Sequence, residues 1–82
     1  MADRRLPLKK LRRIARRFGV EEDVSGGKGS HTKFFQTIDG RKFTYPIPTS
    51  SKEIEQCYVA GFRRRFQLTP ADGVSDEEFY GT

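Results

Sequence analysis

Apolar residues recur at three- and four-residue intervals between Pro7 and Gly19, which collects them on one face of a helix. Pro7 suits the first turn of this helix and Gly19 suits its C-terminal cap. The apolar positions are Leu8, Leu11, Ile14, Ala15 and Phe18. The opposite face holds basic residues, which are Lys9, Lys10, Arg12, Arg13, Arg16 and Arg17. The segment therefore predicts an amphipathic basic helix.

The pattern after this helix changes to that of a sheet. Residues 19–24 predict a short strand, and the three glycines within residues 25–29 predict a flexible turn. Residues 30–38 then predict a second strand.

Asp39-Gly40 is a strong signal for a tight hairpin that leads into a third strand over residues 41–47. The alternating apolar residues of this strand are Phe43, Tyr45 and Ile47. Pro46 and Pro48 are expected to end it, because proline interrupts a ladder of hydrogen bonds. We therefore expect three antiparallel strands in sequence order.

A second helix is predicted from Ser50 to about Leu68. Ser50 and Glu53 have the spacing of a capping box, which marks a helix start. A stripe at four-residue steps should pack on the sheet, and it consists of Ile54, Tyr58, Phe62 and Phe66. Arg63 and Arg64 are expected to point into solvent.

The last residues repeat helix start signals at Thr69-Pro70 and at Ser75 with Glu78. This tail predicts either a turn of helix with Phe79 against the body or a frayed end. The whole order is helix, three strands, helix, with both apolar helix faces directed to one side of the sheet. The expected fold class is a two-layer α+β sandwich (αβββα), one domain over residues 1–82 with its core in residues 7–68.

The net charge is +5, and it is unevenly distributed. Residues 67–82 contain four acidic and no basic residues, so residues 1–66 carry +9. Such a basic body suggests a polyanionic partner, most often nucleic acid, although a well-solvated surface would look the same.

A single cysteine, Cys57, allows no internal disulfide, and no metal or other cofactor is expected. The first residues lack the apolar core of a signal peptide, and no run of eighteen apolar residues occurs. We expect a cytoplasmic protein without a membrane partner.

The segment Lys28-Gly29-Ser30-His31 is the strongest candidate for chemistry, at the junction of the glycine turn and the second strand. Glycine lets a phosphate approach the backbone, Lys28 attracts it and Ser30 can donate a hydrogen bond. His31 titrates near neutral pH and can act as a base on a ribose 2′-OH. These are the parts of a ribonuclease that needs no metal, while the plain alternative is an ordinary surface histidine.

Other basic residues near this segment are supporting candidates for RNA contact. Strand alternation places Lys33 and Phe35 on the same face as His31, and Phe34 on the core face. Phe35 can stack on a base or pack on a partner protein. Arg41 and Lys42 flank the hairpin and can reach a phosphate, and the helix contributes Arg12, Arg13, Arg16 and Arg17.

These segments together resemble the HicA family of toxin-antitoxin ribonucleases. The resemblance consists of Lys28-Gly29-Ser30-His31, an apolar strand, then Asp39-Gly40-Arg41, a strand ending in Pro46, the second helix, and Val74-Ser75-Asp76-Glu77-Glu78-Phe79. It covers roughly residues 8 to 80.

The resemblance implies a double-stranded-RNA-binding-like fold, endonucleolytic cleavage of mRNA and a catalytic role for His31. The implied partners are RNA and a HicB-type antitoxin, so the protein would be a monomer alone and form a hetero-oligomer with the antitoxin.

The chain departs from the family pattern at two places. Many members have a second histidine where this chain has Thr32, and a basic residue with a histidine after the strand-ending proline, where it has Ile47-Pro48-Thr49. A non-catalytic RNA-binding module on the same fold and a basic protein-interaction domain are therefore alternative functions.

Overall fold

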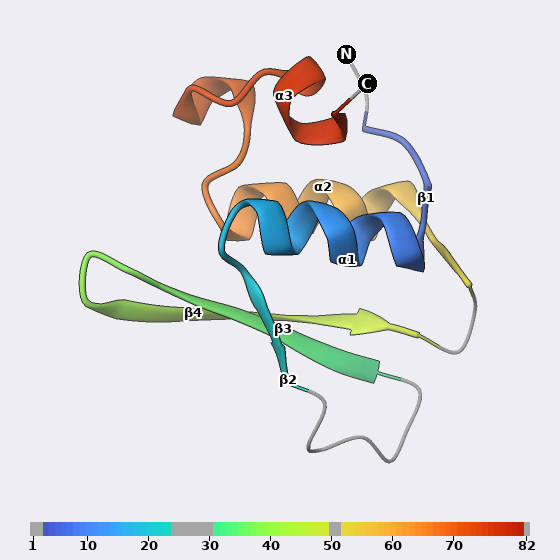
Figure 1. Cartoon of the computed structure of the whole chain (residues 1–82), viewed down its shortest axis with the longest axis horizontal. Helices are drawn as coiled ribbons and strands as arrows, with labels where there is room; N and C mark the ends of the chain where they lie inside the picture. Colours follow the sequence, from blue (N-terminus) through green and yellow to red (C-terminus); the bar gives the residue numbers. More distant parts are fainter. Residues whose placement is uncertain (1–2, 24–30, 50–51, 82) are drawn as a thin grey trace.

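The computed structural model describes residues 3–23, 31–49 and 52–81. Among these residues the chain forms an α+β structure, as the sequence predicts (Figure 1). Its main elements, in chain order, are the helix α1 (Leu8–Arg17), the strands β2 (Glu21–Asp23), β3 (His31–Ile38) and β4 (Arg41–Pro48), and the helix α2 (Gln56–Arg65). The three strands form an antiparallel sheet in the order β2-β3-β4. None of the helices in the described ranges has the length and apolar character needed to cross a membrane.

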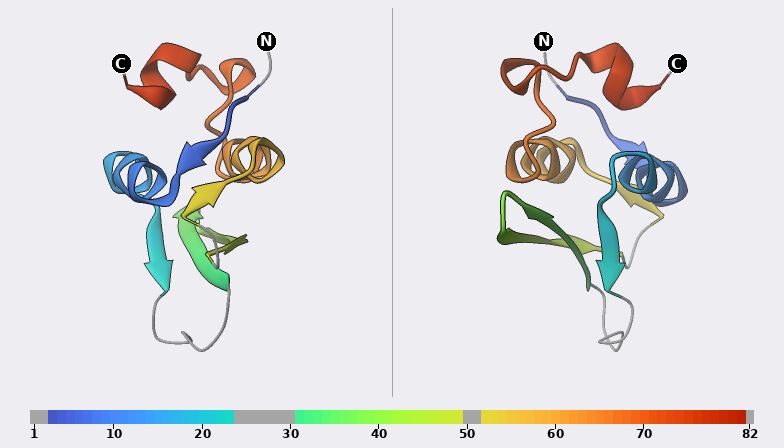
Figure 2. Two further views of the ribbon diagram at one scale, coloured as in Figure 1. Left: turned by 90° about the vertical axis from the view of Figure 1, so that its right-hand side faces the viewer. Right: turned by 60° about the vertical axis from the view of Figure 1, so that its left-hand side comes forward.

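Helices α1 and α2 lie side by side on one face of this sheet, and none of the described helices lies on the other face (Figures 1 and 2). Phe34 of the sheet contacts Phe62 of α2 edge to face, with 5.4 Å between ring centroids. Gly61 allows α2 to approach β4, because a Cβ at this position would overlap the Tyr45 ring. The buried core also includes Leu11, Ile14, Val20, Ile47, Val59, Phe66 and Phe79.

Helix α1 spans Leu8–Arg17, close to its predicted limits. Its end is a Schellman motif, because Gly19 has a φ of 78° and donates to Arg16 O, while Val20 donates to Ala15 O at 2.8 Å. This turn leads the chain directly into β2 at Glu21–Asp23.

Strands β3 (His31–Ile38) and β4 (Arg41–Pro48) are joined by the predicted hairpin. Asp39 and Gly40 both have positive φ, 51° and 80°, as a two-residue type I′ turn requires. Phe34 is fully buried beneath the helices, so the predicted core face of this strand is confirmed.

The prediction that Pro46 and Pro48 end the third strand was wrong, since β4 contains both. The hairpin closes on the pair Ile38 and Arg41, so every second residue of β4 directs its backbone groups away from β3. Pro46 and Pro48 occupy these outward positions, where β4 is the edge strand and no ladder hydrogen bond is lost.

The predicted start of the second helix was also wrong. Glu53–Ile54 forms a short strand, β5, that pairs with β1 at Leu6–Pro7, and α2 spans only Gln56–Arg65. Ser50 lies outside the described residues, and Glu53 belongs to a strand, so the proposed capping box does not open this helix. Residues 53 and 54 pair with β1, which is far away in the sequence, and do not begin the helix. A pattern of local spacing does not reveal such a contact.

Arg63 is buried and not directed into solvent as predicted, with 2% of its surface exposed. Its guanidinium contacts Asp3 Oδ1 at 2.8 Å and Asp76 Oδ1 at 2.7 Å, and donates to the carbonyl oxygens of Leu68 and Val74. Burial alone would lower the pKa of Arg63, but the hydrogen bonds and charges of the two aspartates raise it. The residue therefore connects α2 to both ends of the described chain.

The C-terminal segment is ordered, with a 3-10 turn, η1, at Pro70–Asp72 and a short helix, α3, at Asp76–Tyr80. Each begins with a capping box, so both predicted start signals are confirmed. Phe79 is fully buried, and the segment lies on the side of α1 and α2 away from the sheet (Figures 1 and 2).

Candidate functional site

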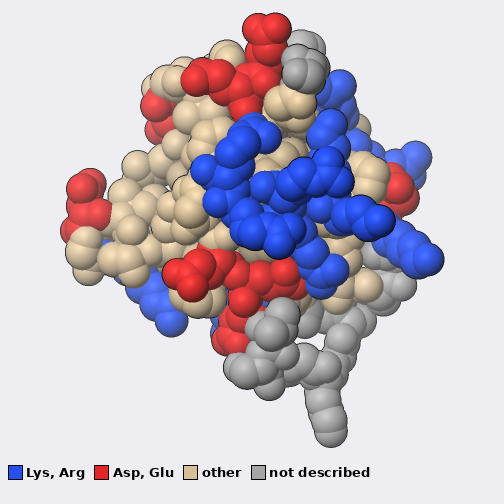
Figure 3. Space-filling model, in the orientation of Figure 1, with Lys and Arg blue, Asp and Glu red and all other residues tan. Residues whose placement is uncertain are grey.

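Basic side chains gather on the outer face of α1, where Figure 3 shows Lys and Arg concentrated above a smaller acidic area. The exposed basic residues of this helix are Lys9, Arg12, Arg13, Arg16 and Arg17. The side chains of Arg13 and Arg16 form no hydrogen bond or ion pair with any residue that the structure describes. Their guanidinium groups are therefore available to an external anion.

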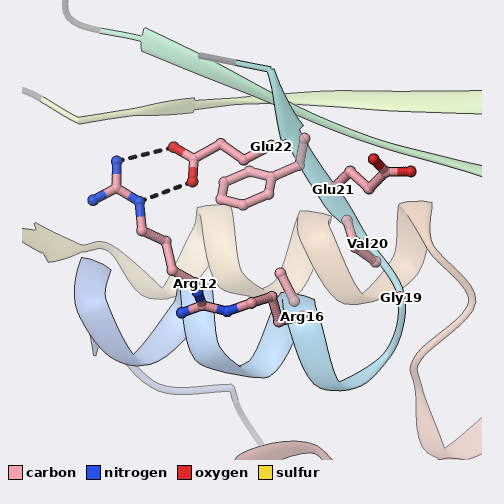
Figure 4. A pocket seen from close by; sticks show the side chains of 8 residues that line it. Arg12, Arg16, Gly19, Val20, Glu21 and Glu22 are labelled. Carbon is pink, nitrogen blue, oxygen red and sulfur yellow. Dashed lines mark hydrogen bonds and ion pairs between the residues drawn. The ribbon is translucent and has the colours of Figure 1, made fainter.

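Arg12 is instead paired with Glu22 of β2. Its Nε and Nη2 atoms donate to Glu22 Oε1 and Oε2, both at 2.9 Å (Figure 4). The hydrogen bond to Glu22 raises the pKa of Arg12. This fork geometry fixes the two side chains against each other and engages the Nε and Nη2 donors of Arg12 with Glu22.

Arg17 is also engaged inside the fold. Its Nη2 donates to the carbonyl oxygens of Glu78 and Phe79, the latter at 2.9 Å, near the end of α3. Two of the four arginines predicted to contact RNA thus stabilise the fold, and Arg13 and Arg16 remain for a ligand.

Glu22 has a second partner, which sequence reasoning missed. Thr32 Oγ1 donates to Glu22 Oε2 at 3.0 Å, so α1, β2 and β3 are linked through one carboxylate. The sequence did contain a signal, because strand alternation puts Glu22 on the same side as the buried Val20. A carboxylate at such a position requires a cation or a donor.

A shallow pocket lies between α1 and β2, and Figure 4 shows its lining. Arg12 and Arg16 come from the helix and Glu21 and Glu22 from the strand. The apolar lining residues are Ala15, Val20 and Phe34. This arrangement can bind an ion or a polar group, but the side chains of its described lining include no hydroxyl, thiol or imidazole group.

A second surface is the sheet face without helices. Lys33 and Phe35 alternate with the buried Phe34, so both belong to this face. Lys42 lies beside them, with its Nζ 4.9 Å from the centre of the Phe35 ring. Arg41 is paired with Ile38 beside the hairpin turn, and its side chain belongs to the opposite face of the sheet from Lys33 and Phe35.

The predicted catalytic segment is only partly described. Lys28, Gly29 and Ser30 lie outside the described residues. For His31 the structure describes the backbone, which begins β3 opposite Pro48. The catalytic role of His31 therefore stays a prediction.

The predicted site residues fall on two surfaces and not on one. Lys33 and Lys42 share the uncovered face of the sheet, on the strands that hold His31 and Pro48. The basic residues of α1 lie on the helix side of the sheet (Figures 1 and 3). An RNA that used both surfaces would have to pass around the edge at β2.

No protein-family model, curated protein or solved structure matches this chain.

Proposed function

We propose that this protein is a HicA-type mRNA interferase, a toxin that cleaves mRNA in the cytoplasm without a metal ion, on a double-stranded-RNA-binding-like fold. The observation that carries the proposal is the Lys28-Gly29-Ser30-His31 sequence leading into the β3–β4 hairpin. The order of helix, three antiparallel strands and helix agrees with it.

In this mechanism His31 takes the proton of a ribose 2′-OH. The 2′ oxygen then attacks the adjacent phosphorus, the bond to the 5′ oxygen breaks, and the leaving oxygen takes a proton from the histidine or from water. Cationic side chains such as Lys28 and Lys33 stabilise the charge that develops on the phosphate. The products are a 2′,3′-cyclic phosphate and a 5′-hydroxyl end.

RNA binding relies on phosphate contacts, which the exposed Arg13 and Arg16 of α1 can make. Such contacts carry little sequence information, so the domain would recognise RNA mainly by backbone shape and 2′-OH groups. A HicB-type antitoxin would inhibit the toxin by covering the residues around His31 in a hetero-oligomer.

The test is cleavage of a long single-stranded RNA in EDTA by the wild type and by His31→Ala, with a binding titration for each. The proposal predicts cleavage by the wild type alone and similar RNA affinity for both proteins, because arginine and lysine residues supply the affinity. Salt-sensitive binding without cleavage by either protein would instead establish a non-catalytic RNA-binding module. Loss of RNA binding at physiological salt would favour a protein-interaction domain.

A further inference from the structure

The contact between Thr32 and Glu22 lies at the point where the pairing of β3 with β2 ends. β2 ends at Asp23, whose partner in β3 is Lys33, so the ladder between the two strands does not reach Thr32. The 3.0 Å hydrogen bond from Thr32 Oγ1 to Glu22 Oε2 extends the attachment of β3 by one more residue. That residue is the neighbour of His31.

Glu22 is itself held in place from the other side by α1. Arg12 binds both carboxylate oxygens at 2.9 Å, and only 17% of the Glu22 side chain is exposed. A carboxylate with three donors on its two oxygens has a fixed orientation. The arrangement therefore connects a rigid helix to the first residues of β3.

We propose that Thr32 and Glu22, the latter held by Arg12, are positioning residues that fix the backbone of His31 for RNA cleavage. This inference rests on the proposed function. Neither residue acts on the substrate itself, because both carboxylate oxygens of Glu22 are engaged by Arg12 and Thr32. The side chain of Thr32 lies on the opposite face of the strand from that of His31, since neighbouring residues of a strand alternate between faces. A displacement of about 1 Å at a reacting group can reduce a rate by roughly 100-fold.

The first experiment compares Thr32→Val, Thr32→Ser and Thr37→Val. Valine removes the hydroxyl and keeps the shape, and serine restores the hydroxyl. Thr37 is an exposed threonine of the same strand whose side chain forms no hydrogen bond with any described residue. We expect kcat to fall at least about 10-fold in Thr32→Val and to be largely retained in Thr32→Ser and Thr37→Val. The Kd for a 2′-O-methyl RNA, which cannot be cleaved by this chemistry, should stay within about twofold in all three.

A second variant and a second readout separate this inference from the proposed function. Glu22→Gln keeps the shape but removes the charge that holds Arg12, so it should also lower kcat without changing the Kd. Hydrogen exchange of the backbone amide of residue 32 should accelerate in Thr32→Val and not in Thr37→Val.

Cleavage by the wild type with an unchanged kcat in both Thr32→Val and Glu22→Gln would overturn the positioning role and leave the proposed function intact. No cleavage by the wild type would overturn the proposed function, and any effect on exchange would then concern the fold alone.

Discussion

Arg63 shows how one side chain determines the arrangement of several segments. A buried guanidinium is stable only when its donors are satisfied, and here two aspartates and two backbone carbonyls satisfy them. The Phe79 ring also lies 4.5 Å from the guanidinium carbon. One residue of α2 therefore contacts Asp3, Asp76 and Phe79.

Arg63→Met should be strongly destabilising, because it leaves Asp3 and Asp76 without their cation and two carbonyls without a donor. Breaking a buried pair by removal of one partner costs about 3–5 kcal/mol. The control is Arg64→Met, an exposed neighbour, which should change the free energy of unfolding by no more than about 0.5 kcal/mol. Urea denaturation of both variants measures the difference, and equal stabilities would contradict the assigned role of Arg63.

At the scale of elements, the sequence predicted structures whose signals are local. The helix α1 with its glycine cap, the Asp39-Gly40 hairpin and the capping box at Ser75 all depend on residues within a few positions of each other. The errors at the second helix and at Arg63 concern contacts between distant residues, whereas the error at Pro46 and Pro48 concerns the position of β4 at the edge of the sheet. Pairing of β1 with β5 shortened the second helix, and burial of Arg63 depended on Asp3, sixty positions away.

The same division applies to the candidate site. Composition and spacing predicted a basic face on α1, but they did not show that Arg12 and Arg17 are engaged by Glu22 and by the carbonyls near the end of α3. A sequence shows which residues are charged, but it does not show which distant residue each charged side chain contacts in the fold. The hydrogen bond from Thr32 to Glu22 was also not predicted, because a threonine in a strand has no local signal for its partner.

The end of α2 offers a stabilising substitution. Gln67 has a φ of 57° in a Schellman motif, with Leu68 donating to Arg63 O at 2.7 Å, and a left-handed conformation is unfavourable for a residue with a Cβ. Gln67→Gly should raise the free energy of unfolding by about 0.5 kcal/mol, after the greater flexibility of the unfolded chain is taken into account.

Gln67→Ala is the control for this substitution, because alanine keeps the unfavourable φ and should give no gain. Thermal unfolding of the three proteins tests the prediction. A stabilisation by alanine equal to that by glycine would show that the backbone conformation is not the cause.

At the scale of the whole molecule, the basic body and the acidic C-terminal segment are joined by specific contacts. Arg17 and Arg63 bind groups of the C-terminal segment, and these contacts leave the outer face of α1 uncovered in Figure 3. The charge of α1 therefore remains available, but through fewer residues than its composition suggests.

This distribution predicts which arginines control the salt dependence of RNA binding. Arg13→Gln with Arg16→Gln should flatten the plot of log Kd against log salt concentration by about 1.4 for two lost contacts to single-stranded RNA. The control is Arg12→Gln with Glu22→Gln, which removes one charge of each sign and should change the slope by less than about 0.7. A larger change in the control than in the first variant would place the RNA elsewhere than on Arg13 and Arg16.

In the proposed function this protein cleaves RNA through attack by the ribose 2′-OH, with His31 as the base. The most direct measurement is incubation of the wild-type protein in EDTA with an RNA and with its 2′-O-methyl counterpart, followed by analysis of the product ends. We expect cleavage of the RNA alone, leaving 2′,3′-cyclic phosphate and 5′-hydroxyl ends. Cleavage of both strands, or of neither, would contradict it.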